Sequence, residues 1–501
     1  MKVKKDSASY IRISFIILAI LITVGVLFIK PQVGVADQGD FDRVMGPSGL
    51  TLLDSDINNP KFIRFYDYIV TDYKIAKIDD TIKILSRCSL SYLIIYINDI
   101  CKLLGQSIFK TQYLATVYSI IYILAFAIIL KSLNIKNNIK LIIVALLILF
   151  VFFDGNYLIW FNSLYGEPMM ITALLLFIAS VLNYIHYKYV IKNNKNIMLR
   201  IIFILLTAFL FIGSKLQVVT ALPFIIFLLI KIIWNNKHTL NAINLIISFA
   251  LICIIIIYPI RISENSDNLS KDTQYNSVFY GVLNGSKTPE QDLIDLGLNP
   301  DMAVEAKKHA YLDSSEYVKY IPGSEITDEE FYNKINNSKL AIFYLTHPIR
   351  LFNGMKYTAG KVFYTSTSLG KCYQSYTQTP VRELHRFTLW SYLRENILPK
   401  NLYFIILFYL TVIIFSFYEY FKNKSNLYIK NVLFLLWTVI LISVAQFPMP
   451  FVGNGKADTA KQLFLFNFIF DWLLLLTFTY IIFKIAALIK LRLKNLKTVL
   501  L

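Results

Sequence analysis

The feature that most constrains this chain is a series of long apolar runs. Crossing about 30 Å of hydrocarbon takes roughly 17–25 apolar residues in a helix, and ten runs reach or approach that length. They cover residues 11–29, 111–130, 139–153, 168–187, 199–213, 216–234, 241–259, 400–421, 431–447 and 462–483. Only 16% of the 501 residues are charged, whereas soluble proteins carry about 25%. The sequence therefore predicts an all-α polytopic membrane protein with about ten transmembrane helices.

The distribution of lysine and arginine predicts which loops face the cytoplasm. If both termini share one side, the short segments on that side hold most of the basic residues that flank the runs and almost no acid. Basic residues near span ends mark the cytoplasmic side. This topology accounts for the formal net charge of +18, so we exclude nucleic-acid binding. We expect a multi-pass protein with both termini cytoplasmic, and the composition, rich in Asn, Lys, Ile and Tyr, favours a bacterial cell membrane.

This topology divides the chain into three parts. Residues 1–260 form a transmembrane core that includes a large first outer loop over 30–110. Residues 261–399 form an extracytoplasmic, α-rich region between spans seven and eight, and residues 400–501 hold the C-terminal transmembrane helices. Within the first loop, residues 82–104 carry polar residues among apolar ones. We predict that this segment is an amphipathic helix on the outer surface, because a span here would reverse every later loop.

Polar residues gather at the outer ends of the spans. Directly after the first span, residues 36–43 hold three carboxylates and one arginine. A carboxylate beside low-dielectric surroundings has its pKa raised and is able to act as a general base, while an arginine is suited to bind phosphate. A solvated loop whose acids only enforce topology is the alternative for this segment.

Three further outer loops add polar side chains. The loop at 154–167 brings Asn162 and Glu167, although helix capping by itself explains a glutamate before Pro168. The turn at 213–217 carries Lys215 and Gln217 near membrane depth, where ionisable groups tend to be functional. The last loop contains Asp458 and Lys461.

Carboxylates and cations at the outer face suit a reaction on a lipid that carries phosphate. No nucleotide-sugar pool exists outside the cell, so glycosyl transfer there requires a polyprenyl-phosphate-linked sugar. A base would accept the proton of the acceptor hydroxyl, and cations would hold the departing lipid phosphate.

The chain resembles the GT-C superfamily of polytopic glycosyltransferases, and within it bacterial glycan-biosynthesis hexose transferases of the WsfD kind. The resemblance rests on four segments: Asp37-Gln-Gly-Asp40-Phe-Asp-Arg43-Val-Met, Asn162-Ser-Leu-Tyr-Gly-Glu167, Ser214-Lys215-Leu-Gln217 and Gly453-Asn-Gly-Lys-Ala-Asp458-Thr-Ala-Lys461-Gln. It implies a catalytic Asp or Glu in the first outer loop, a lipid-phosphate sugar donor and, as is usual in the superfamily, inversion at the anomeric carbon.

By this resemblance Asp37 or Asp40 is the catalytic base. Arg43, Lys215 and Lys461 are phosphate-side candidates, and the matched segments add Asn162, Glu167, Gln217 and Asp458 as substrate-binding candidates. The expected partners are a polyprenyl-phosphate-sugar donor, a glycan or lipid-linked acceptor, and the bilayer. Asp37, Asp40 and Glu167 offer oxygen ligands for a divalent ion, but no spacing is diagnostic, so we expect no cofactor and no metal.

Two alternatives remain at this point. An O-antigen-type polymerase or ligase would depend on Arg and His residues within 260–399 and would not need the first-loop acids. A lipid or glycan flippase without chemistry would line a path across the bilayer with charge, whereas the interiors of these spans are nearly uncharged.

Overall fold

The computed structural model describes residues 7–78, 86–264 and 271–499, and it is predominantly helical. Each of the ten apolar runs corresponds to a helix. These helices are α1 (Ser7–Leu27), α5 (Thr111–Ser132), α6 (Asn138–Phe152), α8 (Glu167–His186), α9 (Ile197–Ile212), α10 (Leu222–Trp234), α11 (Ala242–Glu264), α18 (Leu402–Lys422), α19 (Leu427–Gln446) and α22 (Phe464–Val499).

Length and hydropathy support most of these helices as membrane spans. Within the described residues, eight helices are long and apolar enough to cross a bilayer. A ninth span results if α6 and the short helical segment Gly155–Asn162 are counted as one span with a 57° bend. The remaining helix, Ile197–Ile212, is apolar but shorter. The chain is therefore a multi-pass membrane protein, with eight or nine clear spans where the sequence predicted about ten.

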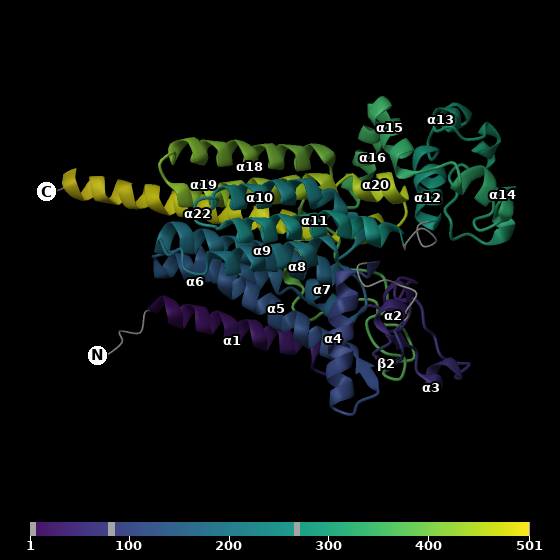
Figure 1. Ribbon diagram of the computed structural model, residues 1–501, viewed down its shortest axis with the longest axis horizontal. Helices are drawn as coiled ribbons and strands as arrows, with labels where there is room; N and C mark the ends of the chain where they lie inside the picture. The colour runs from purple at the N-terminus through teal and green to yellow at the C-terminus, as the bar shows by residue number, and fades with distance from the viewer. Residues whose placement is uncertain (1–6, 79–85, 265–270, 500–501) are drawn as a thin grey trace.

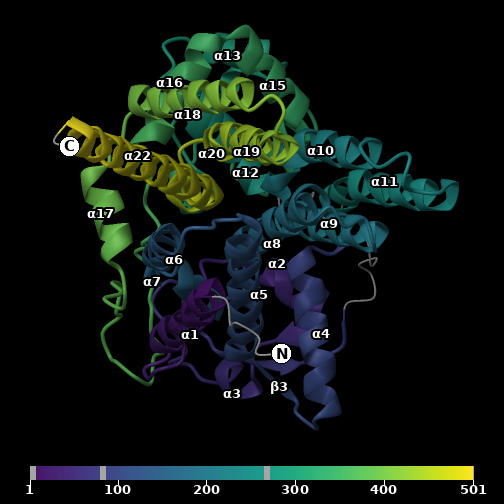
Figure 2. The same cartoon turned by 90° about the vertical axis from the view of Figure 1, so that its left-hand side faces the viewer.

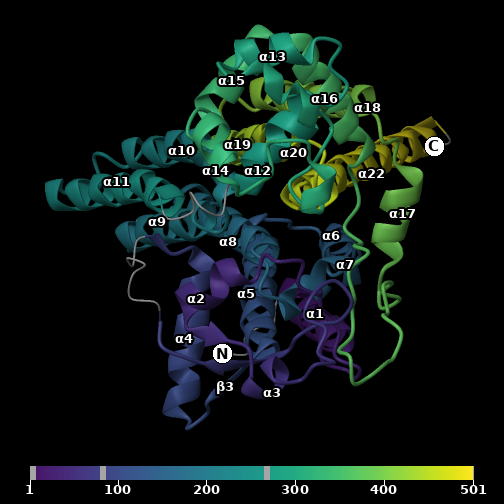
Figure 3. The same cartoon turned by 90° about the vertical axis from the view of Figure 1, so that its right-hand side faces the viewer.

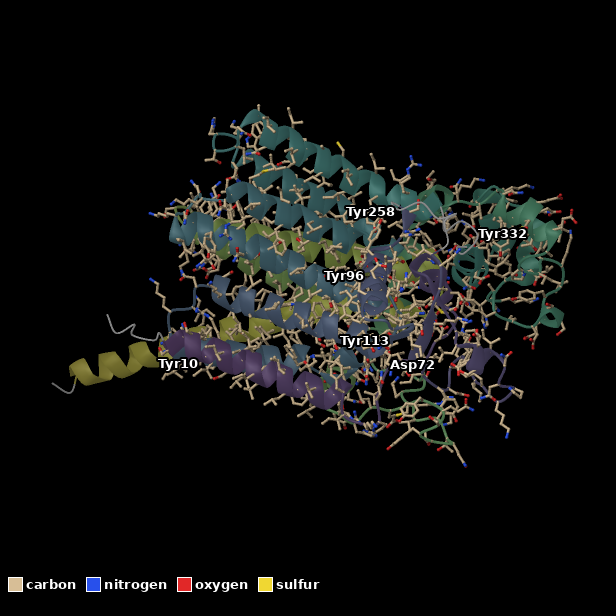
Figure 4. All side chains as sticks on the ribbon, turned by 60° about the horizontal axis from the view of Figure 1, so that its bottom comes forward. Tyr10, Asp72, Tyr96, Tyr113, Tyr258 and Tyr332 are labelled. Atoms are coloured by element: carbon tan, nitrogen blue, oxygen red, sulfur yellow. The ribbon has the colours of Figure 1, made fainter. Side chains whose placement is uncertain are left out.

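The spans form one bundle with distinct ends. The start of α1 and the end of α22 lie at the same end, and the segments outside the bundle are gathered at the other end (Figure 1). Side-chain nitrogen and oxygen atoms concentrate towards the two ends, with Tyr10 near one and Tyr332 near the other, while the helix lengths between carry mostly carbon (Figure 4). This is the distribution that a bilayer requires, because polar groups are costly in hydrocarbon.

The innermost helix of the bundle is α8. It packs against α5 and α9 (Figure 2), and nearly all of its side chains are buried. A helix that is apolar on every face belongs in an interior. At one internal contact, Ser180 of α8 and Thr207 of α9 share a hydrogen bond of 3.0 Å. By contrast, α1 exposes apolar side chains such as Ile13, Ile17 and Leu21, as expected of a helix that faces lipid.

The first large loop folds against one end of the bundle. It contains α2 (Asp42–Ser48), α3 (Asp54–Ile57), α4 (Ser89–Leu103) and a small antiparallel sheet of β1 (Leu50–Thr51), β2 (Asp72–Ile75) and β3 (Ile108–Lys110). In the sheet, Leu50 lies opposite Ile75, and Tyr73 opposite Phe109.

Helix α4 confirms the prediction of a surface helix in this loop. It runs across the ends of the spans instead of along them (Figures 1 and 2). Its buried residues Leu90, Ile94, Ile97 and Cys101 follow helical spacing. The first residues of the predicted segment, 82–85, lie outside the described residues.

The region between α11 and α18 builds a second core. Its helices are α12 (Lys271–Ser277), α13 (Pro289–Asp295), α14 (Glu325–Thr327), α15 (Asn337–Thr346) and α16 (Pro348–Gly360). They bury an aromatic cluster that includes Tyr275, Phe279, Phe331 and Phe343. Phe451 of α20 (Met449–Asn454) joins this core beside Gly354, where an added Cβ would lie 2.2 Å from the Phe451 ring.

An irregular segment, residues 361–388, connects α16 to α17 (Leu389–Ile397). We call it the strap. It runs from the second core down to the first loop and returns (Figure 3). The strap accepts backbone hydrogen bonds of 3.0 Å from Gly34 to Lys371 and from Ala36 to Gly370, so it holds the chain that leaves α1.

Candidate active site

Asn162 fixes the direction in which the chain leaves α1. Its side-chain amide is buried and donates to the carbonyl of Leu27 at 3.2 Å and to that of Val33 at 2.9 Å. Gly34 passes so closely that an added Cβ would lie 2.6 Å from the Asn162 carbonyl oxygen. Asn162 was predicted to bind substrate, and in the structure its side chain contacts the protein scaffold.

We expect Asn162→Ala to destabilise the protein by about 1–3 kcal/mol, because two buried carbonyl oxygens would lose their donor. Thermal unfolding in detergent measures this loss. Asn59→Ala, in an exposed turn of the first loop, is the control. An unchanged melting temperature in Asn162→Ala would show that these hydrogen bonds do not fix the loop.

Asp37, the first candidate base, is built into a turn. Its carboxylate accepts hydrogen bonds from the backbone of Gly39 at 2.8 Å and of Phe41 at 3.2 Å, and it pairs with Arg64 at 3.3 Å. Gly39 has φ +105°, which favours glycine. Burial raises the pKa of Asp37, although the two backbone N–H groups and Arg64 oppose the rise. With both oxygens engaged and its side chain 1% exposed, Asp37 is placed to hold the turn.

Asp40, the second candidate base, projects from that turn towards cations. It pairs with Lys461 at 2.5 Å and with Arg43 at 3.4 Å, and its side chain is 22% exposed. Burial would raise the pKa of Asp40, but attraction to Lys461, Lys215 and Arg43 outweighs burial and holds that pKa well below its usual value. Asp40 is therefore ionised at neutral pH.

Glu167 and Lys215 form the second ion pair of the site. Lys215 Nζ lies 2.6 Å from Glu167 Oε1. The carboxylate of Glu167 is fully buried at the start of α8, and its other oxygen, Oε2, is buried without a hydrogen-bond partner. Because Lys215 also acts on Asp40, and Glu167 on Lys461, the two pairs lie within electrostatic reach of each other.

The structure thus unites five of the predicted residues. We call Asp40, Arg43, Glu167, Lys215 and Lys461 the charge cluster. They come from the first loop, the start of α8, the turn after α9 and the loop before α22, which are far apart in sequence. Under them lies Tyr165, whose ring centroid is 5.4 Å from Lys461 Nζ and whose hydroxyl donates to the Ala36 carbonyl.

The two other predicted residues lie beside this cluster. Asp458 accepts a hydrogen bond of 3.3 Å from the side chain of Gln38. Gln217 donates at 3.2 Å both to the side chain of Gln446 and to the carbonyl of Gln462, so it joins the turn after α9 to α19 and to the start of α22. These contacts make Gln217 part of the frame around Lys215 and Lys461.

A cavity of about 470 Å³ opens next to Lys461. Its walls come from the loop before α22, the end of α16, the strap and the first loop. The lining residues are Gln38, Trp160, Tyr357, Gly360, Lys361, Tyr364, Thr365, Ser366, Thr367, Ser368, Leu369, Lys456, Asp458, Thr459, Ala460, Lys461 and Phe464. This volume lies within the range of pockets that bind small ligands.

Comparison with protein families assigns the chain. Residues 1–499 match the family model described as the YfdI N-terminal transmembrane domain. The chain belongs to this family. No curated protein matches this member of the YfdI N-terminal transmembrane domain family.

One solved structure similar to this YfdI-family chain is the archaeal oligosaccharyltransferase AglB from Archaeoglobus fulgidus, in complex with an inhibitory peptide and a dolichol-phosphate. The two share 14% identity with a TM-score of 0.35, over 93% of this chain and 50% of AglB. The chain therefore spans about half the length of AglB. Likeness at this level does not define an activity, and the resemblance to WsfD-type transferases stays a prediction.

Sequence reasoning missed the scaffold that supports the site in this YfdI-family chain. Arg64 pairs with Asp37 and, at 2.6 Å, with Asp42, and thus closes the turn that presents Asp40. The strap contains Lys371, a buried lysine that donates to the carbonyls of Thr367 at 2.8 Å and Leu369 at 2.9 Å. No short motif marks either residue.

A buried ion pair was also missed. Arg394 of α17 lies 2.6 Å from Asp471 of α22, and both side chains are fully buried. Asp471 also accepts hydrogen bonds from Tyr157 at 2.7 Å and from Trp390 at 2.9 Å. Here a signal existed, because an acid inside an apolar run is costly and calls for a partner.

The described residues contain no group of three His, Cys, Asp or Glu side chains arranged to hold a metal ion. The acids Asp37, Asp40 and Glu167 are separately engaged with Arg64, Lys461 and Lys215. Independence from metal stays a prediction.

Proposed function

We propose that the chain is a membrane glycosyltransferase that moves a hexose from a polyprenyl-phosphate-linked donor to a cell-envelope glycan or lipid-linked acceptor. The observation that carries the proposal is the charge cluster, in which Asp40 and three cations meet beside a cavity at one end of the spans. Both substrates would be reached there, the lipid from the bilayer and the glycan from the aqueous side.

The reaction needs one base and one phosphate site. The acceptor hydroxyl oxygen attacks the anomeric carbon, the bond from that carbon to the phosphate oxygen breaks, and polyprenyl phosphate leaves with the electron pair. The hydroxyl proton passes to the carboxylate of Asp40. Lys461, Lys215 and Arg43 hold the phosphate, whose negative charge increases in the transition state. Attack opposite the leaving group would invert the anomeric centre.

The ion pairs of the cluster explain how a strongly ionised aspartate would act as a base. Lys461, Lys215 and Arg43 hold the pKa of Asp40 low. A bound phosphate would attract the same cations and weaken their hold on the carboxylate, so the pKa of Asp40 would rise towards the value that proton transfer needs. Donor binding would thereby prepare the base.

The proposal places the charge cluster on the outer face of a bacterial cell membrane, with both termini in the cytoplasm. Two observations support this orientation. The start of α1 and the end of α22 lie at the end of the bundle opposite α2, which carries Arg43 of the cluster (Figure 1). The short loops assigned to that end carry the excess of lysine.

A polymerase or ligase would use the Arg and His residues of the 260–399 region, but several of those side chains are held in separate pairs with acids. Arg350 pairs with Asp292 at 2.9 Å and His347 lies 3.3 Å from Asp295. Arg382 pairs with Asp67. These groups brace loops and do not converge on one site. A flippase would need a charged path through the bundle, whereas the charge cluster lies at one end and Asp471, the acid inside α22, is paired with Arg394.

Polyprenyl phosphate binding tests the phosphate site. We expect Lys215→Met and Lys461→Met each to weaken binding of polyprenyl phosphate about 10- to 100-fold, since one charge-assisted contact contributes about 1.5–3 kcal/mol. Titration of the purified full chain in nanodiscs measures this change. Lys334→Met, an exposed lysine of the second core region, is the control for the loss of one charge.

Each substitution also removes the lysine partner of a carboxylate: Asp40 loses Lys461, and Glu167 loses Lys215. A thermal-unfolding curve of each variant therefore separates a loss of binding from a loss of folding. Folded variants of both lysines that bind polyprenyl phosphate as the unsubstituted chain does would contradict the proposed phosphate site.

A further inference from the structure

The cavity beside the charge cluster carries its own excess of positive charge. Lys361 and Lys456 line it together with Lys461. Lys400 approaches its wall and donates to the Tyr364 hydroxyl at 2.6 Å. The one carboxylate among the lining residues is Asp458. A cleft lined mainly by one sign of charge concentrates ligands of the opposite sign.

The lysines of the cavity divide into two sets. Lys461 is paired with Asp40 and belongs to the charge cluster. Lys456 instead donates to the Asn284 side chain at 2.9 Å and lies over the Tyr357 ring at 5.3 Å. Within the described residues, neither Lys456 nor the exposed Lys361 forms an ion pair with a carboxylate, so their charge is uncompensated.

Basic side chains support the strap wall from behind. The carbonyls of Thr367 and Leu369 accept hydrogen bonds from buried Lys371, and that of Ser368 accepts one from Arg382 at 2.6 Å. Three consecutive carbonyls are thus held by basic side chains, of which Arg382 is itself paired with Asp67. Thr367 and Ser368 themselves line the cavity.

The acid Glu395 is held by groups of this same wall. Glu395 is bound by the backbone N–H groups of Thr365 at 2.9 Å and Ser366 at 3.1 Å, and by the Ser366 hydroxyl at 2.7 Å. Asp458 is held by Gln38. The wall is therefore fixed by its own hydrogen bonds, with lysines left to meet a ligand.

We propose that this cavity binds an acceptor that carries a phosphate group, and that Lys361 and Lys456 recognise its negative charge. That this ligand is the acceptor of a transfer reaction rests on the proposed function. The donor phosphate already has cations of its own in Arg43, Lys215 and Lys461. Lys361 and Lys456 form a second set that lines the cavity, which Arg43 and Lys215 do not, and this suits a second substrate. The lining also contains the half-buried aromatic side chains Tyr357 and Tyr364, which suit contact with a sugar ring.

Soluble sugars test this inference without any transfer. The probes are glucose 6-phosphate and glucose, titrated against the purified full chain in nanodiscs of neutral lipid at one ionic strength. We expect glucose 6-phosphate to bind at least tenfold more tightly than glucose. Raising the salt from 50 to 500 mM should weaken only the phosphorylated sugar, because salt screens exposed charges.

Two double variants test whether Lys361 and Lys456 recognise the phosphate group. In Lys361→Gln/Lys456→Gln the preference for glucose 6-phosphate should fall below twofold. Lys334→Gln/Lys356→Gln removes the same charge from exposed lysines outside the cavity, Lys356 lying on α16 with Lys361 at its end, and should keep the preference. Equal binding of the two sugars by the unsubstituted chain, or equal loss in both double variants, would overturn the inference.

Polyprenyl phosphate distinguishes the two possible sources of phosphate. If it binds equally well to the unsubstituted chain and to Lys361→Gln/Lys456→Gln, the second lysine set serves the acceptor. If its affinity falls tenfold in that double variant, the cavity binds the donor phosphate and the acceptor assignment is wrong. Neither binding measurement depends on Asp40. A failed binding test therefore does not contradict the proposed transfer reaction, and a failed test of Asp40 as the base does not contradict the binding result.

Discussion

Replacing Asp40 with Asn should lower hexose transfer by two to four orders of magnitude. General-base catalysis contributes about 10²–10⁴-fold, and an amide cannot accept the hydroxyl proton. The side chain keeps nearly its size, so the loop should stay in place, although Lys461 loses its carboxylate partner at 2.5 Å. Transfer from a panel of polyprenyl-phosphate-linked hexoses to membranes that contain the natural acceptor measures the effect, with protein amount and melting temperature recorded for each variant.

Asp37→Asn is the matched comparison, because it changes the same group three residues earlier. Its amide oxygen would still accept from the backbone of Gly39 and Phe41, but Arg64 would lose one of its two carboxylates. We expect a lower melting temperature, and activity that follows the amount of folded protein. A folded but inactive Asp37→Asn together with a fully active Asp40→Asn would transfer the role of base to Asp37.

The charge state of Asp40 adds a pH signature to this experiment. The neighbouring cations lower its pKa in the free protein, so the carboxylate stays ionised as the pH falls. The pH dependence of kcat/KM reports groups of the free enzyme. Between pH 5 and 8 it should therefore show no loss of activity from protonation of Asp40. A loss with an apparent pKa near 6 would indicate that another group is the base.

The sequence predicted the positions of the spans along the chain because the bilayer imposes a length and a polarity on each helix. The same constraint places Asp40, Glu167, Lys215 and Lys461 at the ends of spans on one side, and the structure brings these four candidate residues together. Helix α4 followed from its amphipathic pattern and from the cost of reversing the topology.

The strap could not be predicted, because its pairing has no periodic pattern. Gly34 and Lys371 are joined by a backbone hydrogen bond across more than 300 positions, and neither lies in a regular strand. The scaffold contacts of Asn162 depend on where this chain turns after α1. The apolar residues of this loop follow neither the spacing of a strand nor that of a helix, so the sequence does not indicate which residues pair. The residues that orient Asp40 are therefore visible only in the structure.

The buried pair of Arg394 and Asp471 leads to the second large effect. We expect Arg394→Met to destabilise the protein by about 3–5 kcal/mol, because it leaves a buried carboxylate without its cation. One oxygen of Asp471, Oδ1, is already buried without a hydrogen-bond partner. Arg394 also donates to the Phe363 carbonyl at 3.0 Å and to the Thr365 hydroxyl, so the cavity wall at Thr365 should loosen as well.

The double variant Arg394→Met/Asp471→Leu separates charge from packing. Replacing both partners of a buried pair with apolar residues is often nearly neutral for stability, so the double variant should recover most of the melting temperature lost in Arg394→Met. Its cavity wall would still lack the hydrogen bonds to Phe363 and Thr365. Binding of glucose 6-phosphate should therefore remain weakened in a protein that is stable again. Equal destabilisation by the single and double variants would mean that Arg394 contributes through its contacts with the strap and not through its charge.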